Sequence, residues 1–221
     1  ETTEEALHDV MEDFNGILKT GKAVAFVVRK EALSYDEPVE YNNGNILIRE
    51  EVIKHIVRAA GEEPIISTTG KASRELFEIR TANRQSHKYD FLTVGSMGHS
   101  SSIALGIAVN KPNTNVWCID GDGAVLMHMG ALAVLGNIKP NNMIHIIVNN
   151  GAHETVGGMP TVAGSMDLVA VARACGYPYA ISVDNLEKLD GELAAAKKRK
   201  ALSLIEVKCA IGARVNLGRP T

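Results

Sequence analysis

The sequence has 221 residues, of which 45% are hydrophobic and 22% charged, and its formal net charge is −3 at pH 7. This length and mildly acidic balance fit one sizeable soluble α/β domain with an additional piece. The sequence has no run of about 18 apolar residues, which argues against a transmembrane helix, and no Lys/Arg tract of the kind that binds nucleic acid. We expect the KKRK segment at 197–200 to be the solvated end of a helix, where cations suit the helix dipole.

The cysteines and the first residues bear on the cellular compartment. Cys118, Cys175 and Cys209 lie in apolar stretches and are odd in number. We interpret them as buried free thiols of a reducing, cytoplasmic compartment rather than as a disulfide framework or a metal site. The sequence begins with ETTEEALHD, without Met and without a signal-peptide pattern.

The first 45 residues predict the end of a separate domain. Apolar residues at helical spacing over 3–18 predict a helix, and the Val-rich run AVAFVVRK at 23–30 predicts a buried strand. Residues 31–45 contain Pro38 and an Asn-Asn-Gly turn, so we interpret them as a linker. We therefore expect residues 1–30 to be the last helix and strand of another α/β domain, whose sheet lies outside this sequence.

From residue 46 onward, strands and helices alternate. The predicted helices are 48–60, 70–80 with a turn at its start, 95–110 with a Gly-rich entry, 124–137, 168–176 and 185–200. The predicted strands are 64–68, 91–94, 115–120, 143–150, 179–183 and 203–209, and a Gly-rich loop covers 151–165. This alternation predicts an α/β fold, a doubly wound parallel sheet with helices on both faces, over residues 46–221.

Three Gly-rich segments follow predicted strands: GSMG at 95–98, GDG at 121–123 and NNGA at 149–152. Ligands bind beyond the carboxyl ends of the strands in an open parallel sheet, so these segments should meet in one crevice. Gly121 and Gly123 would let a phosphate approach the backbone at a helix N-terminus, but the Asp122 carboxylate alone would repel it. A divalent cation held by Asp122 and by an Asn at the end of the next strand removes this conflict, and Mg²⁺ prefers such oxygen ligands.

From residue 121 to residue 150 the sequence resembles the thiamine diphosphate enzymes, because GDG, a helix, a strand and NN follow one another as in their cofactor motif. The resemblance implies thiamine diphosphate and Mg²⁺ as cofactors, with Asp122, Asn150 and the carbonyl of Ala152 as metal ligands. The segment TTGK at 68–71 and the segment GSMG resemble other cofactor-binding parts of the family, with Met97 as the apolar wedge under the cofactor. The implied cofactor-binding residues are Thr69, Gly70, Lys71, Ser96, Met97, Gly121, Gly123 and Ala124.

The flanking segments, from STTGKASRELFE to the terminal LGRPT, narrow the resemblance to phosphonopyruvate and sulfopyruvate decarboxylases. It implies a carboxy-lyase that decarboxylates a 2-keto acid, with phosphonopyruvate giving phosphonoacetaldehyde and CO₂ as the preferred reaction. It also implies that 46–221 is the diphosphate-binding domain and 1–30 the end of a pyrimidine-type domain. The catalytic glutamate of the family is expected in that domain, so no catalytic residue is assigned here. We expect a dimer or tetramer, and an inactive chain without the pyrimidine-type domain of the same or a partner subunit.

Several assignments stay open at this stage. His153 and Glu154, in the loop after the metal ligands, and His99 are candidates to face the substrate, with a solvated role as the alternative. We expect Asn149 and His145 to be structural. Sulfopyruvate or another 2-keto acid is an alternative substrate, in which case the chain could be one subunit of a larger decarboxylase. A non-catalytic module that binds phosphate or a nucleotide at the same helix N-terminus is the second alternative.

Overall fold

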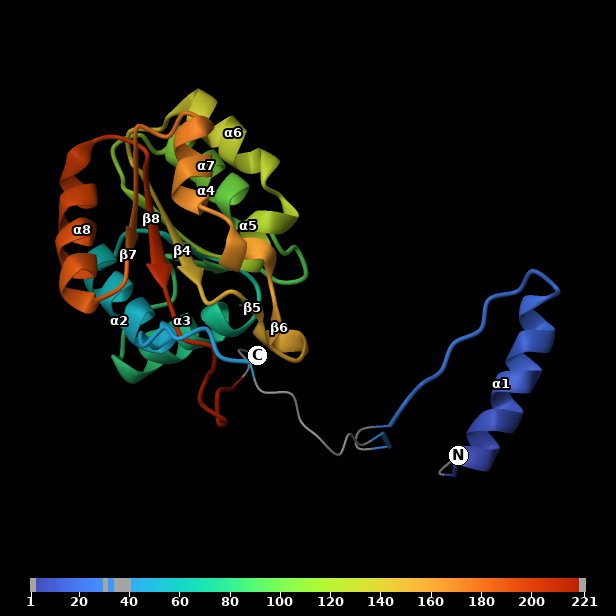
Figure 1. Cartoon of the computed structure of the whole chain (residues 1–221). Coiled ribbons are helices and arrows are strands. Elements are labelled where there is room, and N and C mark those ends of the chain that lie inside the picture. The colour runs from blue at the N-terminus through green and yellow to red at the C-terminus, as the bar shows by residue number, and fades with distance from the viewer. Residues whose placement is uncertain (1–2, 30–31, 34–40, 219–221) are drawn as a thin grey trace. The chain divides into compact units, whose positions relative to one another are not determined.

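The computed structural model describes residues 3–29, 32–33 and 41–218, which fall into two units, Glu1–Glu40 and Tyr41–Thr221 (Figure 1). The boundary between the units lies inside the predicted linker. Among the described helices, none combines the length and hydrophobicity that crossing a bilayer requires.

The first unit contains the predicted helix as α1 (Glu4–Leu18), whose N-terminus is capped by the Thr3 hydroxyl accepting from the Ala6 N–H at 3.2 Å. Phe14 packs on Phe26 with ring centroids 4.6 Å apart, but no residue of α1 is buried. The described residues 23–29 of the predicted strand 23–30 are not assigned to any strand, and residue 30 lies outside the described residues. Since the sheet that this strand would join was expected outside this sequence, the strand stays a prediction. A strand needs a neighbouring strand to satisfy its N–H and C=O groups, and the described residues of this unit supply none.

The second unit contains the predicted parallel sheet. Its six strands lie in the order β2-β1-β3-β4-β8-β7, and every neighbouring pair is parallel. The strands are β1 (Ile65–Ser67), β2 (Asp90–Leu92), β3 (Val116–Gly121), β4 (Met143–Asn149), β7 (Tyr179–Val183) and β8 (Ser203–Lys208). The predicted fold class is therefore confirmed.

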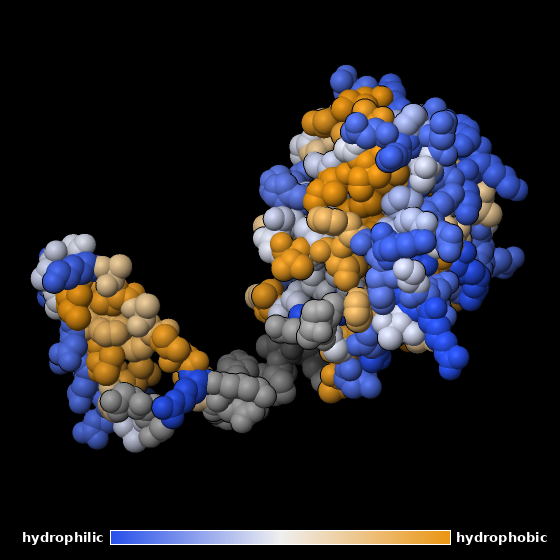
Figure 2. Space-filling model, turned by 180° about the vertical axis from the view of Figure 1, so that it is seen from behind, coloured by the Kyte–Doolittle hydropathy of each residue, from blue (hydrophilic) through white to orange (hydrophobic). Residues whose placement is uncertain are grey.

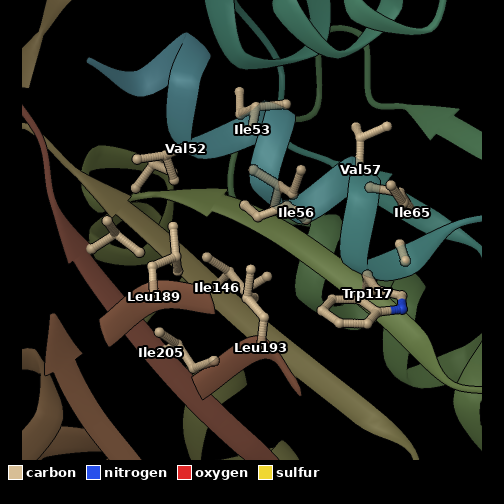
Figure 3. Close-up of a cluster of buried hydrophobic side chains, with 14 of the residues drawn as sticks. Val52, Ile53, Ile56, Val57, Ile65, Trp117, Ile146, Leu189, Leu193 and Ile205 are labelled. Carbon is tan, nitrogen blue, oxygen red and sulfur yellow. The ribbon is translucent and has the colours of Figure 1, made fainter. Parts of the chain in front are cut away.

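Helices cover both faces of this sheet (Figure 1). One face carries α2 (Arg49–Ala60), α3 (Lys71–Ala82) and α8 (Leu186–Arg199); the other carries α4 (Ser100–Asn110), α5 (Asp122–Met127), α6 (Gly130–Ile138) and α7 (Leu168–Ala174). Figure 3 shows the first core, in which Ile53 and Ile56 of α2 and Leu193 of α8 face Ile146 and Trp117 of the sheet. Burial on both faces explains why the central strands are continuous apolar runs.

The predicted helix 124–137 differs from the structure, which has two helices, α5 and α6, with a break at His128 and Met129. His128 has non-helical torsion angles, φ −131° and ψ 46°. Gly98 fits closely beside this break: a Cβ at Gly98 would lie 2.8 Å from both the Ala124 carbonyl oxygen and the His128 ring. The break in the helix and the close approach of Gly98 place the GSMG loop in contact with α5. Helical periodicity alone cannot show such a tertiary contact.

The order of the strands positions the ligand site. The chain passes from β1 outward to β2 and then returns across β1 to begin β3, so the direction of winding reverses between β1 and β3. A crevice opens at the carboxyl ends of two strands at such a reversal. The loops after β1 and β3 are TTGK and GDG, and the loop after β4 contains Asn150. That loop forms a small antiparallel pair, β5 (Ala152–His153) and β6 (Met159–Pro160), with 3₁₀ turns at Glu154–Val156 and Val162–Ser165.

The packing of α6 on the end of α7 gives a test of this architecture. A Cβ added at Gly136 would lie 1.9 Å from the Cys175 carbonyl oxygen, so Gly136→Ala should lower the free energy of unfolding by about 1–3 kcal/mol. Gly106→Ala is the matched control, because Gly106 is an exposed residue of α4 with no atom near its Cβ position. The control should gain up to about 1 kcal/mol from helix propensity. Urea denaturation measures both; equal effects would contradict this packing.

Candidate functional site

A cavity of about 140 Å³ lies where the loops after β1, β3 and β4 meet. Nine of the eleven predicted cofactor- and metal-binding residues line it: Thr69, Lys71, Met97, Gly121, Asp122, Gly123, Ala124, Asn150 and Ala152. His153 and Glu154, two of the predicted substrate-facing residues, also line it. The three loops, up to about 80 residues apart in the sequence, are therefore brought to one place by the parallel sheet.

Asp122 is the buried charge of this cavity, with 3% of the residue exposed. Its Oδ2 accepts a hydrogen bond from the Thr161 hydroxyl at 2.5 Å. Burial raises the pKa of Asp122, although the Thr161 hydroxyl and the N–H groups of Asp122, Asn150 and Gly123 act in the opposite direction. Among the residues that the structure describes, no Lys or Arg forms an ion pair with Asp122. A buried carboxylate with hydrogen-bond donors but without a cation fits a metal ligand.

Asn150 lies beside Asp122 at the end of β4 and is also buried. Its Nδ2 donates to Glu154 Oε2 at 2.7 Å, and its Oδ1 accepts from the Ala152 N–H at 3.1 Å. The preceding residue differs, since Asn149 Nδ2 donates to Glu206 Oε1 at 2.7 Å on the neighbouring strand β8. Asn149 is thus held in the sheet, as expected for a structural residue, and Asn150 turns toward the cavity.

The Ala152 carbonyl is directed out of the small β5–β6 pair. The Thr161 N–H donates to the Gly151 carbonyl at 2.7 Å, which makes the opposed residues Ala152 and Pro160 a pair without mutual hydrogen bonds. In an antiparallel pair, the C=O of such a residue points away from the neighbouring strand. A carboxylate, an amide oxygen and a backbone carbonyl, all oxygen donors at one cavity, are a fitting set for Mg²⁺.

Gly123 lines the cavity at a closely packed position that has no room for a side chain. A Cβ at this position would lie 2.9 Å from His153 Cε1 and 3.3 Å from Met97 Cε. His153 and Met97 therefore stand directly against the start of α5, one from the loop after β4 and the other from the loop after β2. An imidazole and an apolar side chain therefore both pack against Gly123, on the side where its Cβ would be.

Three predicted residues lie away from the cavity lining. Gly70 lies behind it, with its Cβ position 3.7 Å from the Thr155 hydroxyl and its φ at +99°. Ser96 is exposed. His99 is also exposed and packs on His128, with ring centroids 4.1 Å apart. Their roles toward cofactor or substrate stay predictions.

A charged network on one wall was not predicted from the sequence. Arg49, at the start of α2, donates from Nε and Nη2 to the two oxygens of Glu75 at 2.7 and 2.8 Å, and from Nη1 to Glu154. Glu154 also lies 3.4 Å from the Lys71 ammonium. Burial raises the pKa of Glu154, but the charges of Arg49 and Lys71 lower it below its usual value. Arg49 and Glu75 sit in amphipathic helical patterns, and nothing in those patterns marks them as parts of a site.

Comparison with known proteins identifies the domain. The family described as "Thiamine pyrophosphate enzyme, C-terminal TPP binding domain" matches residues 68–207. Phosphonopyruvate decarboxylase of Streptomyces viridochromogenes is 39% identical over 156 residues, which cover 71% of this chain and 38% of the relative. Sulfopyruvate decarboxylase subunit beta of Methanocaldococcus jannaschii is 36% identical over 162 residues, which cover 72% of this chain and 82% of the relative.

Among solved structures, the thiamine diphosphate-dependent 4-hydroxybenzoylformate decarboxylase of Rhodococcus jostii RHA1 has the same fold, with a TM-score of 0.62 and 20% identity. The similarity covers 80% of this chain and 34% of that one. The chain thus belongs to the thiamine pyrophosphate enzymes, in which it is the C-terminal domain that binds the cofactor, also called thiamine diphosphate. It spans about two fifths of the length of the phosphonopyruvate decarboxylases that it matches.

The uncompensated charge of Asp122 gives a stability test. Because burial raises its pKa in the folded state, the ionised form destabilises the folded protein at neutral pH. Asp122→Asn should therefore keep or raise the free energy of unfolding in EDTA. Asp90→Asn is the control: burial also raises the pKa of Asp90, but its carboxylate pairs with the buried Arg80 guanidinium through two 3.1 Å bonds. Loss of this carboxylate leaves the Arg80 charge buried without its partner and should cost about 3 kcal/mol. A comparable loss for both variants would make Asp122 a structural residue.

Proposed function

We propose that the enzyme to which this chain contributes is a thiamine diphosphate- and Mg²⁺-dependent decarboxylase of 2-keto acids. The observation that carries the proposal is the buried Asp122 carboxylate, which has no cationic side chain among the described residues and lies beside Asn150 in an open cavity. The 36–39% identity to phosphonopyruvate and sulfopyruvate decarboxylases supports the same reaction class. When bound, thiamine diphosphate supplies an electron sink that stabilises the carbanion left by loss of CO₂.

The residues of this chain would bind and orient the cofactor. Asp122, Asn150 and the Ala152 carbonyl would hold Mg²⁺, which neutralises the repulsion between the Asp122 carboxylate and a diphosphate. N–H groups at the start of α5, from Gly123 and Ala124, would donate to the diphosphate, because a helix N-terminus presents N–H groups that have no partner within the helix. Met97 would supply an apolar contact to the cofactor ring.

A second domain is needed to complete this site. We place the catalytic glutamate in a pyrimidine-type domain of the same or a partner subunit, as the resemblance implies. Figure 2 shows apolar residues gathered on one face of the Tyr41–Thr221 unit. Exposed apolar side chains occur on α5, α6 and the loop beside the cavity, namely Met127, Met129, Val134, Ile138, Val156, Met159 and Val162. So many exposed apolar side chains are typical of a surface that another domain covers.

We propose phosphonopyruvate as the substrate, with phosphonoacetaldehyde and CO₂ as products. This choice is supported by the 39% identity to two phosphonopyruvate decarboxylases and by the STTGKASRELFE and GDGAVLMHMG segments. Sulfopyruvate is the alternative, since a sulfopyruvate decarboxylase subunit is almost as similar and matches over most of its own length. Both compounds are 2-keto acids with a tetrahedral anionic group, so one site architecture serves both.

The cofactor assignment predicts the behaviour of Asp122→Ala. In the assembled enzyme, this variant should retain its fold but lose Mg²⁺-dependent binding of thiamine diphosphate by about 100-fold or more, because a charged metal ligand is absent. Isothermal titration calorimetry with thiamine diphosphate, in Mg²⁺ and in EDTA, measures this loss. Binding of thiamine diphosphate by Asp122→Ala at wild-type affinity would remove Asp122 from the site.

The substrate assignment predicts the outcome of a panel of 2-keto acids. The assembled enzyme, supplied with thiamine diphosphate and Mg²⁺, should release CO₂ from phosphonopyruvate with kcat/KM at least about tenfold above sulfopyruvate and pyruvate, a difference of about 1.4 kcal/mol in transition-state binding. A preference for sulfopyruvate would keep the reaction class and change the substrate. Turnover by the 221-residue chain alone would contradict the proposed second domain.

A further inference from the structure

We propose that Glu154 is a positioning residue that fixes the side-chain amide of Asn150 with its oxygen available to the cation beside Asp122. The proposal rests on the proposed function, because it requires the metal site described above. The sequence predicted that Glu154 faces the substrate, whereas this proposal has Glu154 orient Asn150. Glu154 would act through Asn150, without touching cofactor or substrate.

The physical need for such a residue comes from the chemistry of an amide. The two ends of an Asn side chain have nearly the same size, but one end accepts and the other carries two N–H donors. An amide turned by 180° would present N–H donors to the metal and would be repelled. A carboxylate can only accept, so it selects the nitrogen end. Glu154 Oε2 accepts from Asn150 Nδ2 at 2.7 Å, within the range of charge-assisted hydrogen bonds.

A second bond specifies the same orientation. The Ala152 N–H donates to Asn150 Oδ1 at 3.1 Å, which requires oxygen at that end of the amide. This bond is longer and its acceptor is neutral, so the Glu154 contact contributes the larger share of the preference. Both partners come from the loop just after Asn150. The loop therefore sets the orientation of the amide locally, before any metal binds.

Glu154 is itself held in one position. Its side chain is 7% exposed, and its Oε2 also accepts from Arg49. Its Oε1 accepts from the Gly212 N–H at 2.8 Å and lies 3.4 Å from the Lys71 ammonium. Arg49 in turn is fixed by its two bonds to Glu75. A carboxylate with four donors around two oxygens has little freedom to rotate, so it can act as a rigid reference for the amide.

The chain contains a matched pair that does not face the cavity. Asn149 Nδ2 donates to Glu206 Oε1 at 2.7 Å, the same length as the bond between Asn150 and Glu154. The Asn149 oxygen accepts from the Gly151 N–H at 3.0 Å, so the two amides have the same pattern of bonds. Glu206 is 2% exposed and lies on β8. Removal of its carboxylate tests the general effect of losing a buried amide–carboxylate bond next to the site.

The experiment measures the Mg²⁺ concentration that half-saturates thiamine diphosphate binding by the assembled enzyme, with calorimetry at saturating cofactor. Glu154→Ala should raise this concentration roughly 10–100-fold, the usual effect of removing a partner that orients a metal ligand. Glu206→Ala should leave it within about twofold, although both variants lower the melting temperature. Equal effects of the two variants on the Mg²⁺ requirement would overturn the proposal. If Glu154→Ala does not fold, Glu154→Met gives the same comparison at nearly full side-chain length.

One further variant separates orientation from charge. Glu154→Gln keeps an oxygen that can accept from Asn150 and Arg49, and its affinity for Mg²⁺ should stay within a few-fold of wild type. If the negative charge of Glu154 attracted the cation directly, Glu154→Gln would lose as much affinity as Glu154→Ala, which would overturn the proposal.

A double-mutant cycle completes the test. In the Asn150→Ala background the ligand is absent, so Glu154→Ala should add no further loss of Mg²⁺ affinity. A loss that persists in this background would show that Glu154 acts independently of Asn150. Failure of the proposed function looks different: the wild-type enzyme would then show no Mg²⁺-dependent binding of thiamine diphosphate at all, and Asp122→Ala would match it.

Discussion

The site depends on one buried negative charge. Asp122 is the first residue of α5, and its carboxylate accepts a hydrogen bond from the Thr161 hydroxyl, while the nearby N–H groups of Asn150 and Gly123 favour its ionised form. These donors solvate the carboxylate but do not neutralise it, and the described residues bring no cationic side chain to it. A chain that keeps such a charge in its interior lowers its own stability unless a cation completes the arrangement. We interpret the glycines on either side of Asp122 and the oxygen donors across the cavity as parts of the site that would bind this cation.

The parallel sheet is what makes this arrangement possible. Asp122 and Asn150 come from the carboxyl ends of β3 and β4, which pair along their whole length, so their separation is set by sheet geometry. The two hydrophobic cores, one on each face, hold these strands in register. The loops contribute only short additions to this frame, such as the β5–β6 pair that turns the Ala152 carbonyl outward. The rigid part of the fold therefore fixes the positions of the two side chains that are proposed to bind the metal.

Much of the fold and of the candidate site could be predicted from the sequence, because the patterns that indicate them lie within short segments. The period of apolar residues located the sheet and its helices, and GDG followed by NN predicted residues that the structure brings to one cavity. The errors and omissions have tertiary causes. The predicted helix 124–137 breaks where Gly98 packs against His128. Arg49 and Glu75 contact each other beside the cavity only because α2 and α3 pack together. The residue pattern of each helix alone does not predict this contact.

The charged wall changes how Glu154 should be understood. By sequence it follows the metal ligands and could have pointed at a substrate. In the structure its carboxylate is fully engaged by Arg49, Lys71, the Gly212 N–H and Asn150. A substrate would have to displace one of these donors, and an anionic substrate would be repelled by the carboxylate that remained. The same contacts that make Glu154 a poor partner for a 2-keto acid make it a good anchor for a neutral amide, whose orientation nothing else nearby sets as strongly.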